Sequence, residues 1–291
     1  MLDREQDRAK NGQGVAERMP RIDAAAHRRA YEASLADPDA FWREQSHRID
    51  WVRRPTRIKN TSFAPGHISI RWFEDGTLNV AANCIDRHAA RHGERTAIIW
   101  EPDDPAEPVR RISYAELLEQ VCRMAGVLRQ HGVGKGDRVV IYMPMIPEAA
   151  YAMLACARIG AIHSVVFGGF SPDALANRIT DCDARVVITA DTGPRGGRKT
   201  PLKQNVDAAL AQITQDMKVM VVRRTGDPVP WTQGRDIDLL AEMEQQPPLL
   251  PLCRDGGRGS ALHPLHLGIH RQAQGGGPYL RGLSRLCLAH A

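Results

Sequence analysis

Short apolar runs of strand length recur through the middle of this chain, and helical patterns separate them. The runs are rich in Val and Ile and lie at residues 138–143, 161–167, 185–190 and 218–222. Runs of this length and composition are typical of strands that are buried on both faces. Because helices alternate with these strands, we predict an α/β fold with a doubly wound parallel sheet that is covered by helices on both faces.

Several helix starts can be read directly from the sequence. Pro147 suits the first position of a helix, and Ser171 can cap the helix that follows the second apolar run. Ser113 and Glu116 have the spacing of a capping box, which opens a helix to about residue 131. Further helices are predicted at 31–46, 79–92, 203–215 and 237–244, and further strands at 96–101 and 110–112.

The turn after the second apolar run is Phe167-Gly168-Gly169-Phe170. Glycines at this point let the backbone approach a ligand closely, because they carry no Cβ atom. The start of the next helix offers backbone N–H groups without an intrahelical partner, which favour an anion. This turn is therefore one candidate binding element.

A Gly-rich basic segment follows the third run, and its notable residues are Arg195, Gly196, Gly197, Arg198, Lys199 and Lys203. Flexible backbone with clustered cations suits a phosphate group. A solvated basic loop is the alternative, and the residues alone leave both interpretations open. A P-loop is excluded, because Arg198 occupies the position of the glycine that would precede the lysine.

Three long segments, in this order, resemble the acetyl-coenzyme A synthetase family of the acyl-adenylate-forming superfamily. They are residues 72–84 (WFEDGTLNVAANC), 163–171 (HSVVFGGFS) and 195–203 (RGGRKTPLK). The resemblance covers roughly residues 31–243. It implies an incomplete acyl-adenylate-forming fold with an N-terminal helical extension.

The resemblance and the composition together imply four regions. We expect a disordered leader at 1–28, the N-terminal extension of the family at 29–92, the first part of an AMP-binding domain at 93–246, and an out-of-family tail at 247–291. The leader is rich in charged residues and lacks the apolar stretch of a signal peptide. The tail has no Asp, Glu or Lys after Asp255, and we expect it to be disordered.

The genetic code offers an explanation for this tail. With suitable synonymous codons, residues 265–276 (LHLGIHRQAQGG) read one base downstream become YTSGSTGKPKGV. That sequence is the phosphate-binding loop that the family carries at this point. We therefore expect the chain to leave the family's reading frame near residues 247–254, with a real variation of the domain as the alternative.

The resemblance implies an AMP-forming acetate–CoA ligase, which joins acetate to ATP and passes the acetyl group from acetyl-adenylate to coenzyme A. The partners would be small molecules: acetate, ATP with Mg²⁺, and coenzyme A. Because the ATP-binding loop is out of frame, we expect this chain to be inactive, and a non-catalytic fragment that binds coenzyme A weakly is the alternative. Acetate or propionate specificity and the oligomeric state stay open.

The resemblance assigns no catalytic residue to the chain but places part of the coenzyme A site in it. Phe167, Gly168 and Gly169 would line the route of the pantetheine and nucleotide, and the phosphates would be held by Arg195, Gly196, Gly197 and Arg198. His163, Asp137 and Arg138 are interpreted as structural residues.

Composition and charge bear on nucleic-acid partners, membrane spans, thiol redox state and metal sites. The formal net charge of +5 is modest and no aromatic-basic strip accompanies it, so we expect no nucleic-acid partner. No apolar run is long enough to span a membrane. The six cysteines are scattered without a Cys-x-x-Cys pair, which favours reduced thiols and a cytoplasmic location. His263, His266 and His270 lack an acidic or Cys partner, so we assign no metal site.

Overall fold

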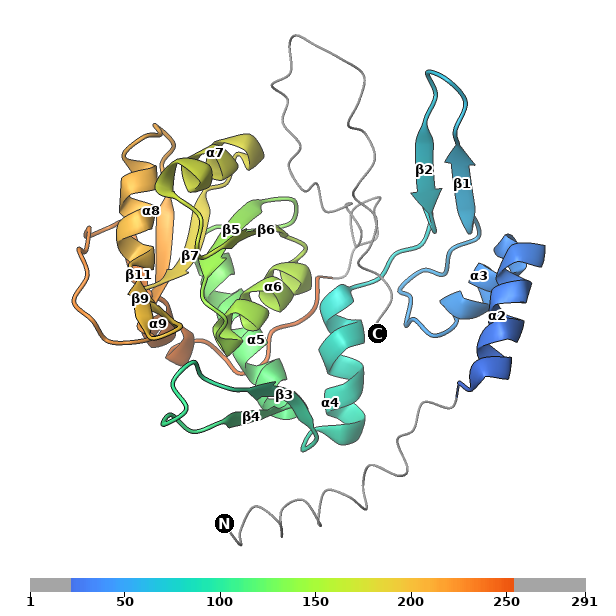
Figure 1. Ribbon diagram of the computed structural model, residues 1–291, viewed down its shortest axis with the longest axis horizontal. Coiled ribbons are helices and arrows are strands. Elements are labelled where there is room, and N and C mark those ends of the chain that lie inside the picture. Colours follow the sequence, from blue (N-terminus) through green and yellow to red (C-terminus); the bar gives the residue numbers. More distant parts are fainter. Residues whose placement is uncertain (1–21, 254–291) are drawn as a thin grey trace, which may run out of the picture. The chain divides into compact units, whose positions relative to one another are not determined.

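The computed structural model describes residues 22–253 (Figure 1). The chain divides into two compact units. The first contains the residues up to Asp50 together with Pro55–Gly76, and the second contains Trp51–Arg54 and the residues from Thr77 onward. Most of the predicted leader and of the predicted tail lies outside the described residues.

The first unit consists of two helices and a hairpin, namely α2 (Ala24–Ala36), α3 (Pro38–Ser46), β1 (Lys59–Ser62) and β2 (Ser69–Trp72). The carboxylate of Asp23 caps α2, and that of Asp37 caps α3. We expected the first helix to begin at Tyr31, but it begins earlier, at Ala24. Residues 24–28, which we assigned to a disordered leader, are helical because Asp23 supplies a cap.

Aromatic side chains hold the helices of this unit to its hairpin. The rings of Trp42 in α3 and Trp72 in β2 meet edge to face, with centroids 5.7 Å apart. Phe41 packs against Trp42 in the same way at 5.3 Å. Edge-to-face contacts of this kind add to the stabilisation that burial provides. These bulky residues therefore have a packing role in this unit.

Asp75 supplies a pH-dependent contribution to the same unit. Its carboxylate accepts hydrogen bonds from the Thr56 hydroxyl at 2.5 Å and from the backbone N–H groups of Thr56 and Arg57 at 3.0 Å. The Thr56 hydroxyl is the largest cause among these hydrogen bonds, which together lower the pKa of Asp75 to about 2. All three bonds favour the ionised carboxylate.

We expect Asp75→Asn to be less stable than the wild type at pH 7 and equally stable near pH 2. The folded pKa lies below the unfolded value of about 3.9, so the stabilisation is complete above about pH 5 and is lost as the pH falls toward 2. Urea unfolding of both proteins at several pH values measures the difference. Glu32→Gln, at an exposed position of α2, is the control. A difference between Asp75→Asn and the wild type that persists unchanged to pH 2 would contradict the assignment.

The second unit is built on a five-stranded parallel sheet in the order β11-β10-β7-β5-β6. Its strands are β5 (Arg138–Met143), β6 (Ile162–Phe167), β7 (Val186–Ala190), β10 (Lys218–Val222) and β11 (Asp236–Asp238). The four predicted strands are present and parallel, which confirms the α/β prediction. The fifth strand, β11, was missed, because three residues are too few to show a periodic pattern.

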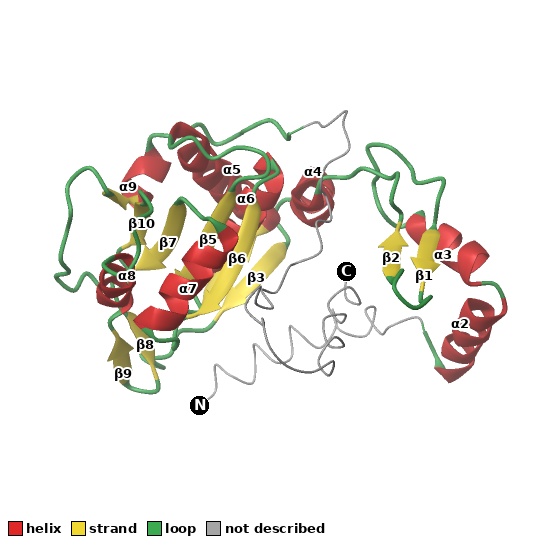
Figure 2. Ribbon diagram, turned by 90° about the horizontal axis from the view of Figure 1, so that it is seen from above, coloured by secondary structure: helices red, strands yellow, loops and turns green. Residues whose placement is uncertain are grey.

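Helices cover both faces of this sheet (Figure 2). The helices are α5 (Tyr114–Gln130), α6 (Pro147–Ile159), α7 (Pro172–Cys182), α8 (Leu202–Leu210) and α9 (Leu239–Glu244). α5, α6 and α9 pack together on one face, and α7 and α8 pack together on the other. The capping box of Ser113 and Glu116 and the cap by Ser171 are present as predicted. α8 ends at Leu210, well before the expected residue 215.

The remaining elements complete the unit. Four of them precede the sheet in the chain, namely η2 (Ala82–Asp86), α4 (Arg87–His92), β3 (Thr96–Trp100) and β4 (Arg110–Ser113), and two follow β7, namely β8 (Gly193–Arg195) and β9 (Arg198–Thr200). The π-helix η2 and α4 lie within the predicted helix at 79–92. β3 and β4 confirm the two predicted strands, and the structure shows that they pair antiparallel.

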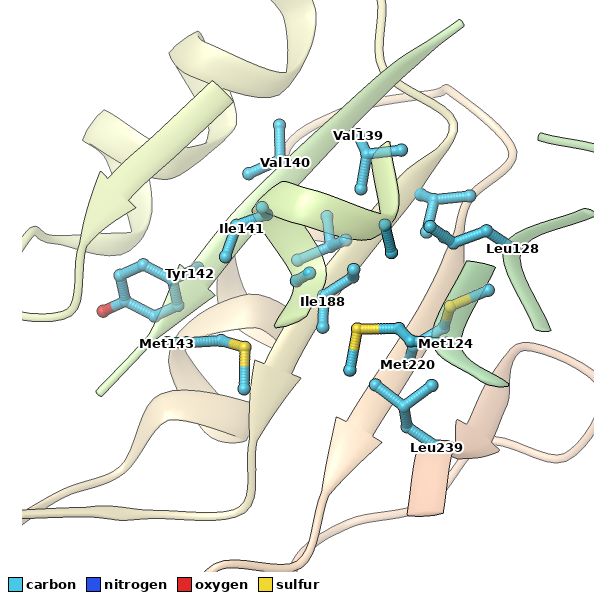
Figure 3. Close-up of a cluster of buried hydrophobic side chains, with 14 of the residues drawn as sticks. Met124, Leu128, Val139, Val140, Ile141, Tyr142, Met143, Ile188, Met220 and Leu239 are labelled. Atoms are coloured by element: carbon cyan, nitrogen blue, oxygen red, sulfur yellow. The ribbon is translucent and has the colours of Figure 1, made fainter. Parts of the chain in front are cut away.

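Residues of β5 form the centre of the apolar core (Figure 3). Val139, Val140, Ile141 and Tyr142 are each at most 1 % exposed, although neighbouring side chains point to opposite faces of the sheet. Helices on both faces explain why this strand is apolar without alternation. The side chains that surround it in Figure 3 include Met124, Leu128, Ile188, Met220 and Leu239.

Arg158 at the end of α6 ties the last described residues to this unit. Its guanidinium donates to the carbonyl of Leu250 at 2.7 and 2.9 Å and pairs with the Asp86 carboxylate at 2.9 Å. The N–H of Cys253 in turn donates to the Arg158 carbonyl at 3.2 Å. Leu250 and Cys253, which we placed in the tail, therefore contact the domain. Residues 254–291 lie outside the described part.

Candidate functional site

The two candidate binding turns emerge from the same edge of the sheet. β5 lies between β6 and β7 and is parallel to both, with Met143 opposite Phe167 and Tyr142 opposite Thr189. The turn at 167–170 follows β6, and the basic segment follows β7. In open α/β sheets, ligands bind outside the carboxyl ends of the strands. The structure therefore brings both turns to the edge where such a site is expected.

The Phe167–Phe170 turn is held from below by the Tyr142 hydroxyl. This hydroxyl lies 3.1 Å from the carbonyl oxygen of Gly168 and 2.9 Å from that of Phe170, and it accepts a hydrogen bond from the Asn205 side chain at 3.1 Å. Burial raises the pKa of Tyr142, so the hydroxyl keeps the proton that it donates. The turn is thus a fixed element and not a loose loop.

The surroundings of both glycines of this turn leave little room for a side chain. A Cβ atom on Gly169 would lie 2.7 Å from the Phe167 ring, and a Cβ atom on Gly168 would lie 3.3 Å from the Met143 carbonyl oxygen. Because Gly169 has no Cβ atom, the Phe167 ring can lie against the turn. Phe167 and Phe170 are both about half exposed and meet edge to face, so they present apolar surface at the sheet edge.

The basic segment is a tight hairpin of β8 and β9, where we expected flexible backbone. Its two turn residues, Gly196 and Gly197, have φ angles of 57° and 72°. A two-residue hairpin turn with positive φ at both positions is of the type that glycine pairs favour. Arg195 and Arg198 are therefore direct cross-strand partners. Because directly opposed residues of a hairpin share one face, the two arginines project on the same side.

The first of these arginines joins the two turns. The guanidinium of Arg195 lies 4.7 Å from the centroid of the Phe167 ring. A cation over an aromatic face is attracted by the electron-rich ring, and the stacking limits the motion of a long side chain. The three site residues predicted from separate strands, Phe167, Arg195 and Arg198, therefore lie in one neighbourhood.

The two lysines of the basic segment form ion pairs within the fold. Lys203 is completely buried and pairs with the carboxylates of Asp207 at 2.8 Å and Asp236 at 2.9 Å. Lys199 donates to the carboxylate of Asp227 at 2.8 Å. Burial therefore keeps Lys203 away from a ligand, whereas Lys199 is exposed and its ammonium group is paired with Asp227.

Asp103, in the loop between β3 and β4, was missed by the sequence analysis. Its carboxylate accepts hydrogen bonds from the N–H groups of Gly196 at 3.0 Å and Gly197 at 3.3 Å. These glycines were expected to help hold phosphates, but in this structure their N–H groups are occupied. No local pattern around Asp103 indicates a partner that is so distant in sequence.

Asp191, the residue after β7, is a second acidic residue that the sequence did not reveal. It is completely buried, and its carboxylate accepts hydrogen bonds from the N–H groups of Thr192, Arg224, Thr225 and Gly226 at 2.7 to 3.2 Å. These bonds join the carboxyl ends of β7 and β10. The hairpin of β8 and β9 begins shortly after β7. A buried carboxylate of this kind is stabilised by its four donors and acts as a structural clamp.

The residues interpreted as structural have structural contacts. Arg138 donates to the carbonyl of Cys182 and pairs with the Asp183 carboxylate, and Asp137 accepts from the N–H of Gly134 at 2.7 Å. His163 has a pKa lowered by burial. Within residues 22–253, no three potential metal ligands cluster, and the His-rich segment at 263–270 lies outside these residues.

A cavity of about 400 Å³ lies at the opposite, amino edge of the sheet. Some of the residues that line it pair with one another or with the fold, since Arg138 pairs with Asp183 and His131 pairs with Glu242. We therefore place the candidate site at the carboxyl edge. Among the helices formed by residues 22–253, none has the length and apolar character needed to cross a membrane.

Comparisons with known proteins agree with this arrangement. The family described as acetyl-coenzyme A synthetase N-terminus matches residues 27–84, and the family described as AMP-binding enzyme matches residues 85–251. Acetyl-coenzyme A synthetase of Rhodobacter capsulatus is 62 % identical over 221 residues, which cover 76 % of this chain and 34 % of the relative. The protein of the same name from Methylobacterium radiotolerans is 57 % identical over 259 residues, covering 84 % and 40 %.

A solved structure shows the same architecture. Acetoacetyl-CoA synthetase from Streptomyces lividans matches with a TM-score of 0.64 and 25 % identity, covering 79 % of this chain and 34 % of that one. The chain thus spans between about a third and two fifths of the length of these relatives. The acyl-adenylate-forming fold expected from the sequence is therefore present in part. The match over more than half of its residues shows that the chain belongs to the AMP-binding enzyme family, with the N-terminal region of the acetyl-coenzyme A synthetases.

Proposed function

We propose that this chain carries the coenzyme A-binding part of an acetate–CoA ligase. The complete reaction would join acetate and ATP to acetyl-adenylate and diphosphate, after which the thiol of coenzyme A would displace AMP. Relatives that are more than half identical and are named acetyl-coenzyme A synthetase support the reaction class. The arrangement at the carboxyl edge of the sheet supports the proposal that this chain binds coenzyme A.

The observation that carries the proposal is the pair of arginines on one face of the hairpin. Like charges directly opposite each other destabilise a hairpin, so an anionic ligand between Arg195 and Arg198 would relieve their repulsion. The 3′-phosphate of coenzyme A is doubly charged and can accept hydrogen bonds from both guanidinium groups. Phe167 lies under Arg195 and provides apolar surface for the adjoining part of the ligand.

The roles of the predicted site residues depend on this geometry. Arg195 and Arg198 would contact the phosphate, and Gly168 and Gly169 would shape the turn that presents Phe167. Gly196 would act through its backbone conformation and not as a phosphate donor, and Gly197 likewise, since their N–H groups bind Asp103. No residue of this chain is proposed to be catalytic.

Two versions of the proposal differ in how they explain the sequence after residue 246. In the first, the chain is part of a ligase whose family-like loop is displaced by a shift of reading frame. In the second, it is a non-catalytic polypeptide that binds coenzyme A weakly. DNA sequence across codons 245–291 separates them, because a single-base change that restores the family sequence supports the first version.

The binding proposal predicts a preference for coenzyme A over dephospho-coenzyme A. Two charge-assisted hydrogen-bonding groups should make coenzyme A bind about tenfold or more tightly, since each 1.4 kcal/mol changes affinity tenfold. Arg195→Ala combined with Arg198→Ala should bring the two affinities together. Lysine at both positions should recover only part of the preference, because an ammonium group cannot form the guanidinium fork. Calorimetric titration with both ligands measures these ratios.

The matched control is Lys199→Ala, which removes one positive charge from the same hairpin. Lys199 is paired with Asp227, so this variant should keep the wild-type preference. Equal binding of the two ligands by the folded wild type would reject the role of the arginines. The basic hairpin would then be a solvated surface element.

A further inference from the structure

The β3–β4 loop and the tip of the arginine hairpin are linked by one carboxylate. The Oδ1 atom of Asp103 accepts a hydrogen bond from Gly196 N at 3.0 Å, and Oδ2 accepts one from Gly197 N at 3.3 Å. Both donors are the outward N–H groups of the turn, which have no partner within a two-residue hairpin. The carboxylate thus binds the turn with both oxygens.

The base of the hairpin is fixed independently of Asp103. A Cβ atom on Gly193 would lie 2.9 Å from Cβ of Pro144 and 3.1 Å from Cδ1 of Leu202, so the start of β8 is closely packed. On the other strand, Lys199 is anchored to Asp227. The tip, where the arginines lie, is held to the rest of the unit by Asp103.

Asp103 does not neutralise the arginines that it brings into position. Among the described residues, no ion pair within 4.0 Å joins its carboxylate to Arg195 or Arg198. Its hydrogen bonds go to the turn backbone instead. The guanidinium of Arg195 lies over Phe167, and the arginine pair keeps its capacity for a ligand anion.

We propose that Asp103 is a positioning residue that sets the preference of this site for a ligand with a terminal phosphate. It holds the tip of the hairpin so that the two arginines stay together on one face despite their mutual repulsion. Preorganising two cations lowers the entropy that binding would otherwise cost. This inference rests on the proposed binding of coenzyme A by the arginine pair.

A change of coenzyme A affinity in the opposite direction is also physically possible, so the experiment distinguishes two roles for Asp103. A carboxylate on two turn N–H groups occupies a place that a ligand phosphate could also take. If Asp103 were a competitor of this kind, its removal would tighten the binding of coenzyme A. If it is a positioning residue, its removal weakens the binding of coenzyme A and leaves that of dephospho-coenzyme A nearly unchanged.

The experiment compares the 291-residue wild type with Asp103→Ala and Asp103→Asn by calorimetric titration of coenzyme A and dephospho-coenzyme A. We expect Asp103→Ala to reduce the affinity ratio from about tenfold to below about threefold. Asp103→Asn, which keeps one acceptor oxygen, should give an intermediate ratio. The control is Glu101→Ala, which removes the same charge from an exposed position of the same loop.

Hydrogen exchange adds a readout that is independent of the ligand. Loss of the carboxylate should speed the exchange of the Gly196 and Gly197 amides, while the unfolding midpoint should match that of Glu101→Ala. An unchanged or larger affinity ratio in Asp103→Ala, with a wild type that discriminates, overturns this inference alone. A wild type that binds both ligands equally overturns the proposed function and this inference with it.

Discussion

Replacing Lys203 with alanine is expected to lower the free energy of unfolding by about 3 kcal/mol or more. The ammonium group is fully buried and contacts three acceptors: the carboxylates of Asp207 and Asp236 and the carbonyl of Pro230. Removing one partner of a buried ion pair leaves the other charge without compensation. Unfolding of Lys203→Ala would measure this cost, and Arg195 and Arg198 would stay unchanged.

The state of Asp236 determines the size of the expected loss. Burial opposes ionisation of this carboxyl group, but hydrogen bonds from Arg235, from the Thr232 N–H and from Lys203 hold its pKa below the ordinary value. Asp236 is therefore charged at neutral pH, although its side chain is completely buried. Arg235 would still pair with it in the variant, which places the expected effect at the lower end of the range for buried pairs.

Urea unfolding followed by circular dichroism measures the effect. Lys199→Ala is the matched control, because its pair with Asp227 is largely exposed and such pairs contribute at most about 1 kcal/mol. A loss below about 1 kcal/mol for Lys203→Ala would show that the buried network is not a main source of stability. It would also reopen the interpretation of Lys203 as a ligand-binding cation.

Acetate-dependent exchange of ATP and pyrophosphate by the 291-residue polypeptide is expected to stay at background. We propose that the family's phosphate loop is out of frame at residues 265–276, which would remove the expected donors to the triphosphate from the encoded sequence. Removal of one preorganised donor of an oxyanion already costs on the order of a hundredfold in rate. Loss of the whole loop should therefore abolish measurable exchange.

The incorporation of labelled pyrophosphate into ATP, with and without acetate, measures this activity. The full-length acetyl-coenzyme A synthetase of Rhodobacter capsulatus is the positive control, since it is 62 % identical over the shared region. Robust acetate-dependent exchange by the 291-residue polypeptide would show that residues 254–291 supply the phosphate site in another way. The shifted-frame interpretation would then be wrong.

The main architecture could be predicted because local chemistry agrees with it. The runs at 138–143 and 218–222 are apolar without alternation, and the structure buries these strands between two layers of helices. Ser113 and Ser171 cap helices through hydrogen bonds that span only three residues, so their pattern is visible in the sequence. The strand order and the parallel pairing then bring Phe167 and the arginines to one edge.

The sequence by itself therefore determined the layers of the sheet and the helix starts at Ser113, Pro147 and Ser171, since these depend on local patterns and on contacts between near neighbours. Only the tertiary structure decided which charged residues of the basic segment can reach a ligand. Lys203 is buried, and Asp103 holds a turn that lies far away in sequence. Such pairings depend on which loops the sheet topology brings together. No local period or spacing encodes that choice.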